Sequence, residues 1–193
     1  MRKHHTIHSP FDALQKLISG NAAYKNTSLN PADISILSRL SIAKRGQKPY
    51  AVILTCSDSF VPPEHIFSAG IGELFVVRTA GNVIGDFELG SVEYGTAYLN
   101  AKIVVVLGHN NCSILSAAAD GRSAGHISDV VHEIYLGISR SRNLATAIQD
   151  NLFRSKAKIM ESAIIQNLVN SGELSVVLAI YDDESGEVRF LEN

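Results

Sequence analysis

Three continuous apolar runs constrain the fold of this chain more than any other feature. They are YAVILTC (residues 50–56), ELFVVRTA (73–80) and KIVVVLGHNNC (102–112). Because apolar residues follow one another instead of alternating with polar ones, the first and third runs predict strands that are buried on both faces, and the second run predicts a further strand. Stretches with helical spacing separate the runs, and strands that alternate with helices form a parallel sheet. We therefore expect an α/β fold with a mainly parallel central β-sheet flanked by helices.

Weaker patterns place the other elements around this sheet. Residues 9–26 predict a helix, because Ser9 can cap it and Pro10 suits its first position. Its apolar stripe could pack on its own domain or on a partner subunit, and consists of Phe11, Leu14, Leu17 and Ile18. Further helical patterns cover residues 30–45, 62–72, 86–100 and 126–171, and residues 173–190 predict a hairpin at the sheet edge.

Length and composition restrict the domain organisation and the partners. The chain has 193 residues with no internal repeat, which predicts a single domain over 1–193, with an N-terminal arm and helix at 1–26 and the α/β core at 46–193. A net charge of −2 argues against nucleic acid as a partner. No apolar run approaches the roughly 20 residues of a membrane span, and the basic N-terminus lacks the apolar core of a secretory signal. We expect no membrane association and a cytoplasmic location.

The residues best suited to catalysis or metal binding lie at the ends of two of the predicted strands. Cys56 and Asp58 form a Cys-x-Asp motif at the end of the first run, and His109 and Cys112 form a His-x-x-Cys motif at the end of the third. Ligands of parallel sheets bind beyond the carboxyl ends of the strands, where these residues meet. Two thiolates and an imidazole suit zinc and leave its fourth position open. The alternative is a buried cysteine pair beside a loop histidine.

Several segments resemble the β-class carbonic anhydrases. They are GQKPYAVILTCSDSFVPPEHIF, GELFVVRTAGNVI, GSVEYGTAYLNAKIVVVLGHNNC and YDDESGEV, with LISGNAAY near the start, so that the likeness covers residues 13 to 191. The resemblance implies one zinc ion per subunit, held by Cys56, His109 and Cys112. It also implies that Asp58 is the catalytic carboxylate, which orients zinc-bound hydroxide for attack on carbon dioxide.

The same resemblance implies a substrate pocket and an oligomer. Gln47 matches a glutamine that reaches the substrate across a subunit interface, and Phe75 and Tyr94 match residues that line the carbon dioxide pocket. We therefore expect a homo-oligomer, either a dimer or a tetramer, that interconverts carbon dioxide and bicarbonate. Arg78 and the Ala80–Asn82 turn match a shared structural segment. His65 and His126 are candidate proton shuttles, although an ordinary surface or helix position suits each of them better.

Two residues depart from the family pattern. Phe60, at the edge of the pocket, replaces the arginine of the family's Cys-x-Asp-x-Arg motif, which holds the catalytic carboxylate in place. Ser113 replaces the glycine after the second cysteine, where a serine could also serve as a helix cap. Loss of the arginine leaves Asp58 free to turn onto the zinc. Two hypotheses follow: a carbonic anhydrase of altered rate or substrate, such as carbonyl sulfide or carbon disulfide, or a non-catalytic zinc protein on the same scaffold.

Overall fold

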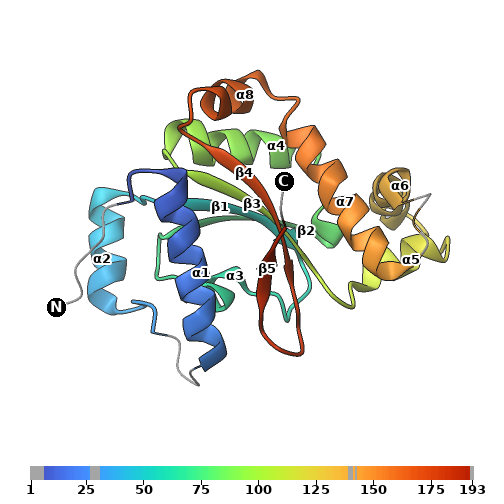
Figure 1. Cartoon of the computed structure of the whole chain (residues 1–193), viewed down its shortest axis with the longest axis horizontal. Helices are drawn as coiled ribbons and strands as arrows, with labels where there is room; N and C mark the ends of the chain where they lie inside the picture. The colour runs from blue at the N-terminus through green and yellow to red at the C-terminus, as the bar shows by residue number, and fades with distance from the viewer. Residues whose placement is uncertain (1–6, 27–30, 139–140, 142, 192–193) are drawn as a thin grey trace.

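The central sheet has five strands in the order β2-β1-β3-β4-β5 (Figure 1). This computed structural model describes residues 7–26, 31–138, 141 and 143–191; the first six residues of the predicted N-terminal arm lie outside that range. Strands β1 to β4 run parallel, and β5 pairs antiparallel with β4 at the edge, as the hairpin pattern predicts. The strands are β1 (Ala51–Cys56), β2 (Leu74–Thr79), β3 (Ile103–His109), β4 (Ser175–Tyr181) and β5 (Val188–Phe190).

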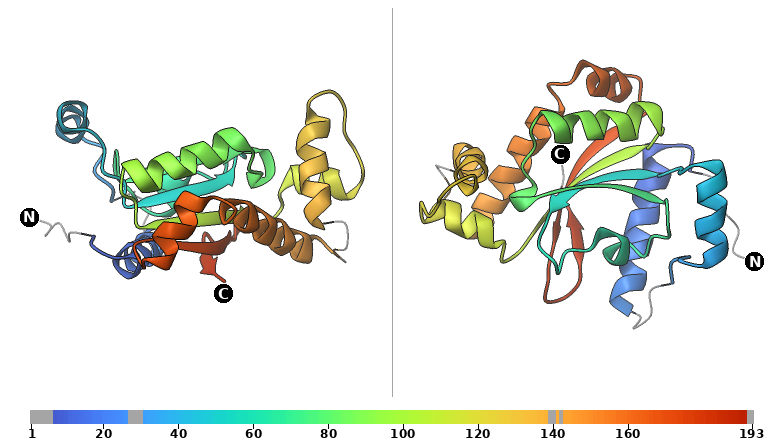
Figure 2. Two further views of the ribbon diagram at one scale, coloured as in Figure 1. Left: turned by 90° about the horizontal axis from the view of Figure 1, so that it is seen from above. Right: turned by 180° about the vertical axis from the view of Figure 1, so that it is seen from behind.

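Helices cover both faces of this sheet, which confirms the predicted fold class (Figure 2). Helices α1 and α3 pack on one face, and α4 to α8 supply apolar side chains to the other. The helices are α1 (Pro10–Asn26), α2 (Ile36–Arg45), α3 (Pro63–Ile66), α4 (Asp86–Glu93), α5 (Ser113–Ala119), α6 (Ile127–Ile138), α7 (Leu144–Ile159) and α8 (Ala163–Asn170). None of the described helices is long and apolar enough to cross a membrane.

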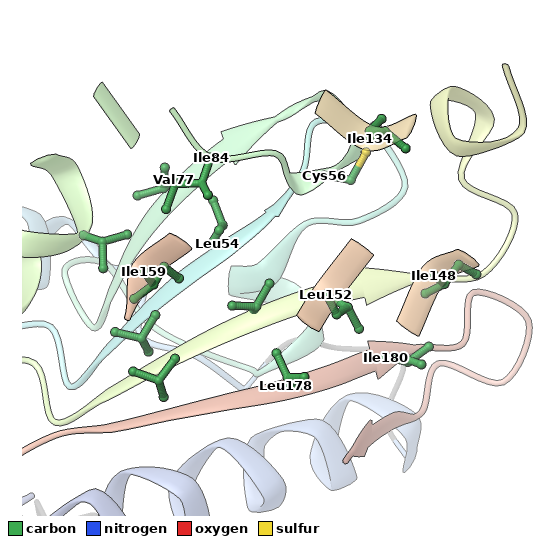
Figure 3. Close-up of a cluster of buried hydrophobic side chains, with 14 of the residues drawn as sticks. Leu54, Cys56, Val77, Ile84, Ile134, Ile148, Leu152, Ile159, Leu178 and Ile180 are labelled. Atoms are coloured by element: carbon green, nitrogen blue, oxygen red, sulfur yellow. The ribbon is translucent and has the colours of Figure 1, made fainter. Parts of the chain in front are cut away.

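The continuous apolar runs divide between two cores because side chains alternate along a strand. In β1, Val52, Leu54 and Cys56 enter the core under α7, whereas Ala51 and Ile53 enter the core under α1. All six residues of β1 and all seven of β3 are buried. Figure 3 shows the first core, in which Cys56 lies at one end beside Ile134 of α6. The strand that carries this cysteine is therefore fixed on both faces.

The first two helices pack less completely than the others. In α1, Leu17 is fully buried, but Phe11 is 69% exposed and Ile18 is 42% exposed, so the predicted apolar stripe divides between the core and solvent. Helix α2 has no buried residue, and it stands apart from the sheet in both views of Figure 2. Its apolar side chains Ile36, Leu37 and Leu40 are half or more exposed. These two helices leave an apolar surface uncovered in a single chain.

Helix α6 is tied to α7 by a pair of ionic contacts. The Glu133 carboxylate lies 2.7 Å from Lys158 Nζ and 3.0 Å from Arg154 Nη2. The Lys158 hydrogen bond is the main cause that lowers the pKa of Glu133, Arg154 adds to it, and partial burial opposes it. A lowered folded-state pKa means that this stabilisation is present above the unfolded-state pKa of about 4.5 and is lost as the pH falls through the folded-state pKa.

We expect Glu133→Gln to destabilise the protein by about 0.5–1 kcal/mol at pH 7, because the carboxylate is partly exposed and screened. At pH 3.5, below the unfolded-state pKa of about 4.5, the same substitution should cost less, because unfolding then takes up a proton at the native glutamate and part of the stabilisation is lost. Urea unfolding of both proteins at the two pH values measures the difference. Glu161→Gln, at an exposed position in the turn after α7, is the matched control. An equal cost of Glu133→Gln at both pH values would contradict the ionic explanation.

Candidate metal centre

Four potential ligands meet at the carboxyl edge of the sheet. Cys56 is the last residue of β1, and Asp58 follows it by two residues. His109 ends the neighbouring strand β3, and Cys112 occupies the position before the first turn of α5. One ligand atom from each residue lies within 4.8 Å of the other three. Because β1 and β3 are adjacent and parallel, the two sequence motifs come together as predicted.

The spacing of these atoms fits a zinc ion with four protein ligands. The Sγ atoms of Cys56 and Cys112 are 3.9 Å apart, and His109 Nε2 lies 3.2 Å from Asp58 Oδ2. A tetrahedral zinc ion with ordinary bond lengths separates two sulfur ligands by about 3.8 Å, and a nitrogen and an oxygen ligand by about 3.4 Å. Among the described residues, the Asp58 Oδ2 and His109 Nε2 atoms are buried without a hydrogen-bond partner. Facing atoms of this kind are placed like two ligands of one ion.

The electrostatics of the cluster also favour a cation. Hydrogen bonding from the Cys112 thiol lowers the pKa of Cys56, and the same shared proton raises the pKa of Cys112. Burial lowers the pKa of His109, but the contacts with Cys56 and the charge of Asp58 outweigh it and raise that pKa. Burial and the Cys56 charge raise the pKa of Asp58. The negative charge of Cys56 contributes to the raised pKa of Asp58, His109 and Cys112, and a divalent cation would neutralise it.

Backbone contacts hold the two ligand-bearing segments in place. Arg78 of β2 donates from Nε to the Cys56 carbonyl at 3.0 Å and from Nη2 to the Asp58 carbonyl at 2.6 Å. The Gly81 N–H donates to Cys56 Sγ at 3.3 Å. On the other segment, the Asn110 side chain donates to Asp182 at 3.1 Å. The role of Arg78 as a structural residue was expected, but the Gly81 contact was not, since no sequence pattern reports which backbone amide faces a sulfur.

Phe60 packs against the histidine of the cluster. Its ring meets the His109 ring edge to face, with 5.2 Å between the ring centroids, and its side chain is 44% exposed. Within the described residues, the ion-pair partner found for the Asp58 carboxylate is His109 and not a guanidinium. Arg78 reaches only the backbone carbonyl of Asp58 in the contacts that the structure shows. The aspartate therefore faces the metal position.

Three of the predicted substrate-pocket residues lie far from the metal ligands in space. Phe75 of β2 pairs with Val52, near the amino end of β1, whereas Cys56 pairs with Thr79, four residues farther along β2. Four residues of a strand place Phe75 about 13 Å from the level of Cys56. The Tyr94 ring lies tilted against the Phe75 ring, with 5.9 Å between the centroids, and Gln47 is exposed before β1 begins. One subunit thus brings together the metal ligands, Asp58 and Phe60, but leaves Gln47, Phe75 and Tyr94 at the opposite end of the sheet.

Three other candidates take ordinary positions. Ser113 is the first helical residue of α5 and is exposed; the capping interpretation is wrong, because the cap position belongs to Cys112. His65 lies exposed in α3. His126 is fully exposed before α6, with Nδ1 3.7 Å from Asp129. A role for either histidine as a proton shuttle stays a prediction.

A parallel α/β sheet with a cysteine, histidine and aspartate cluster at its carboxyl edge defines a candidate zinc protein. Residues 51–188 match the model of the carbonic anhydrase family. Carbonic anhydrase 2 of Mycobacterium tuberculosis is 34% identical over 189 residues, which cover 92% of this chain and 91% of that protein. The carbonic anhydrase of Mycolicibacterium smegmatis is 33% identical over 194 residues, with 94% and 93% covered.

Solved structures agree on the fold. The β-carbonic anhydrase CafA of Aspergillus fumigatus has a TM-score of 0.67 at 25% identity and covers 81% of this chain and 80% of its own. The Coccomyxa β-carbonic anhydrase, solved with acetazolamide, has a TM-score of 0.72 at 23% identity, with 97% and 87% covered. The chain therefore belongs to the β-class carbonic anhydrase family, as the sequence motifs indicate.

Proposed function

We propose that this protein catalyses the reversible hydration of carbon dioxide to bicarbonate at one zinc ion per subunit, held by Cys56, His109 and Cys112. The observation that carries the proposal is the convergence of these three side chains with Asp58 on a carbonic anhydrase fold, at distances that suit zinc. When bound there, zinc lowers the pKa of water from about 15.7 towards 7 and so supplies hydroxide at neutral pH. The fold buries both thiols to 2% exposure or less, which keeps solvent away from those ligands.

Asp58 is the residue that would position the nucleophile. Its carboxylate is partly exposed and lies at the cluster, so it can accept a hydrogen bond from the attacking oxygen and keep that oxygen aimed at the substrate. In the structure, however, Oδ2 sits 3.2 Å from His109 Nε2, where it can serve as a fourth metal ligand. We therefore propose that the site rests in a closed state, from which Asp58 must turn away before reaction.

Phe60 favours this closed state. A phenylalanine offers Asp58 no charged hydrogen bond, and its ring instead packs against His109. The hydration rate is therefore expected to be lower than for the same site with an arginine at position 60. The second candidate function, a non-catalytic zinc protein, draws support from the same observation, because four protein ligands would leave zinc no open position.

Stopped-flow measurement of carbon dioxide hydration between pH 6.5 and 9, on protein with stoichiometric zinc, tests the proposal. Measurable hydration above the rate of buffer with free zinc supports the enzyme. Zinc-loaded protein that gives no hydration at any pH would support the non-catalytic function instead. Parallel assays with carbonyl sulfide and carbon disulfide test the related substrates at the same site.

We further propose that a second copy of the chain completes the substrate pocket. Gln47, Phe75 and Tyr94 lie at the opposite end of the sheet from the metal ligands, so a pocket that contains them needs a partner. The exposed apolar side chains of α1 and α2 offer a surface for that partner, with Phe11 69% and Leu37 78% exposed. Tetrameric β-carbonic anhydrases are described for Sordaria macrospora, at 20% identity. Dimer and tetramer both satisfy this requirement.

Mixed oligomers test the contribution of Gln47 from the partner. A Cys56→Ser subunit and a Gln47→Ala subunit, coexpressed with different tags and purified through both, should regain about half of the native activity, since each mixed pair has one complete site. The matched control pairs a native subunit with a Cys56→Ser/Gln47→Ala subunit, and it should be nearly inactive. If the control is active and the first mixture is not, Gln47 acts within its own subunit. A stable monomer in light scattering would also contradict the proposal.

A further inference from the structure

One face of helix α7 holds the turn that follows β2. Asn151 Nδ2 donates to the Gly81 carbonyl at 2.8 Å, and Ser155 Oγ donates to the Asn82 carbonyl at 3.1 Å. Lys158 Nζ reaches the Ile84 carbonyl at 3.4 Å. These three donors follow one another at helical spacing, so a single face of α7 satisfies three carbonyls of one short segment.

This polar face is unusual because it is buried. Asn151 is 2% exposed and Ser155 is 3% exposed, and both lie among apolar side chains of the core such as Ile148 and Leu152. A buried amide or hydroxyl is costly unless it is hydrogen-bonded. Both groups make their bonds to the turn, so the turn accounts for their presence in the core.

The turn itself places a hydrogen-bond donor on a cysteine of the metal centre. Gly81 has φ +68° and Asn82 has φ +48°, so two successive residues take the left-handed conformation. The positive φ favours glycine at position 81, and a Cβ there would lie 2.6 Å from Ile134 Cδ1, so that this isoleucine would also have to shift. In this conformation the Gly81 N–H points to Cys56 Sγ at 3.3 Å, while its carbonyl points to Asn151.

We infer that Asn151 is a positioning residue for the zinc ligand Cys56, acting through Gly81. The Gly81 N–H and the Gly81 carbonyl belong to adjacent peptide groups that meet at the Gly81 Cα. By holding the carbonyl, Asn151 restricts the backbone angles of Gly81 and so keeps its N–H directed at the sulfur, which sets how much electron density the thiolate donates to the metal. Groups that contact metal ligands from outside the coordination sphere typically change metal affinity 10- to 100-fold, roughly. The inference rests on the zinc centre of the proposed function and extends it to a residue on a distant helix.

Asn151→Leu and Asn151→Ala both remove the amide donor, and leucine does so with little change in side-chain size. Competition with a chelator should show zinc binding weakened about 10-fold in both variants. In the cobalt-substituted protein, the thiolate-to-cobalt absorption band should move to longer wavelength, because a sulfur without its hydrogen bond gives up an electron more readily. Amide exchange at Gly81 should also become faster than in the native protein.

Two controls separate positioning from general loss of stability. Leu152→Ala removes a fully buried side chain from the next position of α7 and destabilises the fold, but it leaves the Gly81 contacts in place. Ser155→Ala removes the bond to the Asn82 carbonyl, one peptide farther from the sulfur. Neither control should move the cobalt band. If Asn151→Leu does not fold, Asn151→Ala and its Gly81 exchange rate supply the same comparison.

The outcomes distinguish this inference from the proposed function. Unchanged zinc affinity and an unmoved cobalt band in both Asn151 variants would overturn the role of Asn151, even if the native protein hydrates carbon dioxide. An equal band shift in Leu152→Ala would overturn it as well. Conversely, a shift confined to the Asn151 variants supports the inference even where the native protein proves inactive towards carbon dioxide.

Discussion

Replacing Phe60 by arginine is expected to raise kcat/KM for carbon dioxide hydration by about 10- to 100-fold. A guanidinium at this position can pair with the Asp58 carboxylate through charge-assisted hydrogen bonds, which are worth about 1.5–3 kcal/mol each. That pairing would draw Asp58 away from His109 and the metal position, so that the fourth position becomes available to solvent and substrate. A free-energy change of about 1.4 kcal/mol corresponds to a factor of ten in rate.

The surroundings of Phe60 allow the substitution. The side chain lies in the turn between β1 and α3 and is 44% exposed, so a longer polar side chain does not have to enter either core. Phe60→Leu is the matched control, because it removes the aromatic contact with His109 without adding a charge. Stopped-flow hydration of the three zinc-loaded proteins gives the comparison. Equal rates for the native protein and Phe60→Arg would contradict the proposed closed state, and an increase in Phe60→Leu would assign the effect to the ring.

The fold and the ligand cluster were open to prediction because their signals are local. Continuous β-branched runs identify strands buried on both faces, and the parallel pairing of β1 with β3 then brings Cys56 next to His109. The motifs Cys-x-Asp and His-x-x-Cys each begin at the last residue of a strand. Each of these inferences depends on neighbours in sequence, together with one rule about where parallel strands end.

Other features depend on contacts between distant segments, and the sequence contains no signal for them. The helix predicted over 86–100 is an α-helix only to Glu93 and then widens into a π-helix at Tyr94–Tyr98, where Gly95 packs against Val52 and Phe75. Likewise, Asn151 interrupts an apolar stripe of α7, and its side chain hydrogen-bonds to a turn 70 residues earlier in the chain. A polar residue on such a stripe indicates that its side chain makes a buried hydrogen bond, but the sequence does not indicate which group is the partner.

The second large effect concerns Cys56 itself: Cys56→Ser is expected to weaken zinc binding by more than about 100-fold. The cysteine supplies one of two thiolates, and serine at the same place remains a neutral hydroxyl at pH 7 and is a poor zinc ligand. Zinc that binds only the folded state adds about 4 kcal/mol of stability at 1,000 times its dissociation constant, which corresponds to roughly 8–16 °C in Tm for a chain of this size. The variant should lose most of that gain.

Metal content after dialysis against a chelator, and Tm with and without added zinc, measure this loss. The native protein should retain one zinc ion per subunit and show the large zinc-dependent rise in Tm, whereas Cys56→Ser should show neither. Ser57→Ala is the matched control, because Ser57 is the exposed neighbour, and the bond from its backbone N–H to the Thr79 carbonyl is kept in the variant. The His109–Cys112 pair and Asp58 remain in the variant, so a retained stoichiometric zinc ion would mean that these three residues suffice. That result would mean that Cys56, and with it the link from α7 through Gly81, contributes little to zinc affinity.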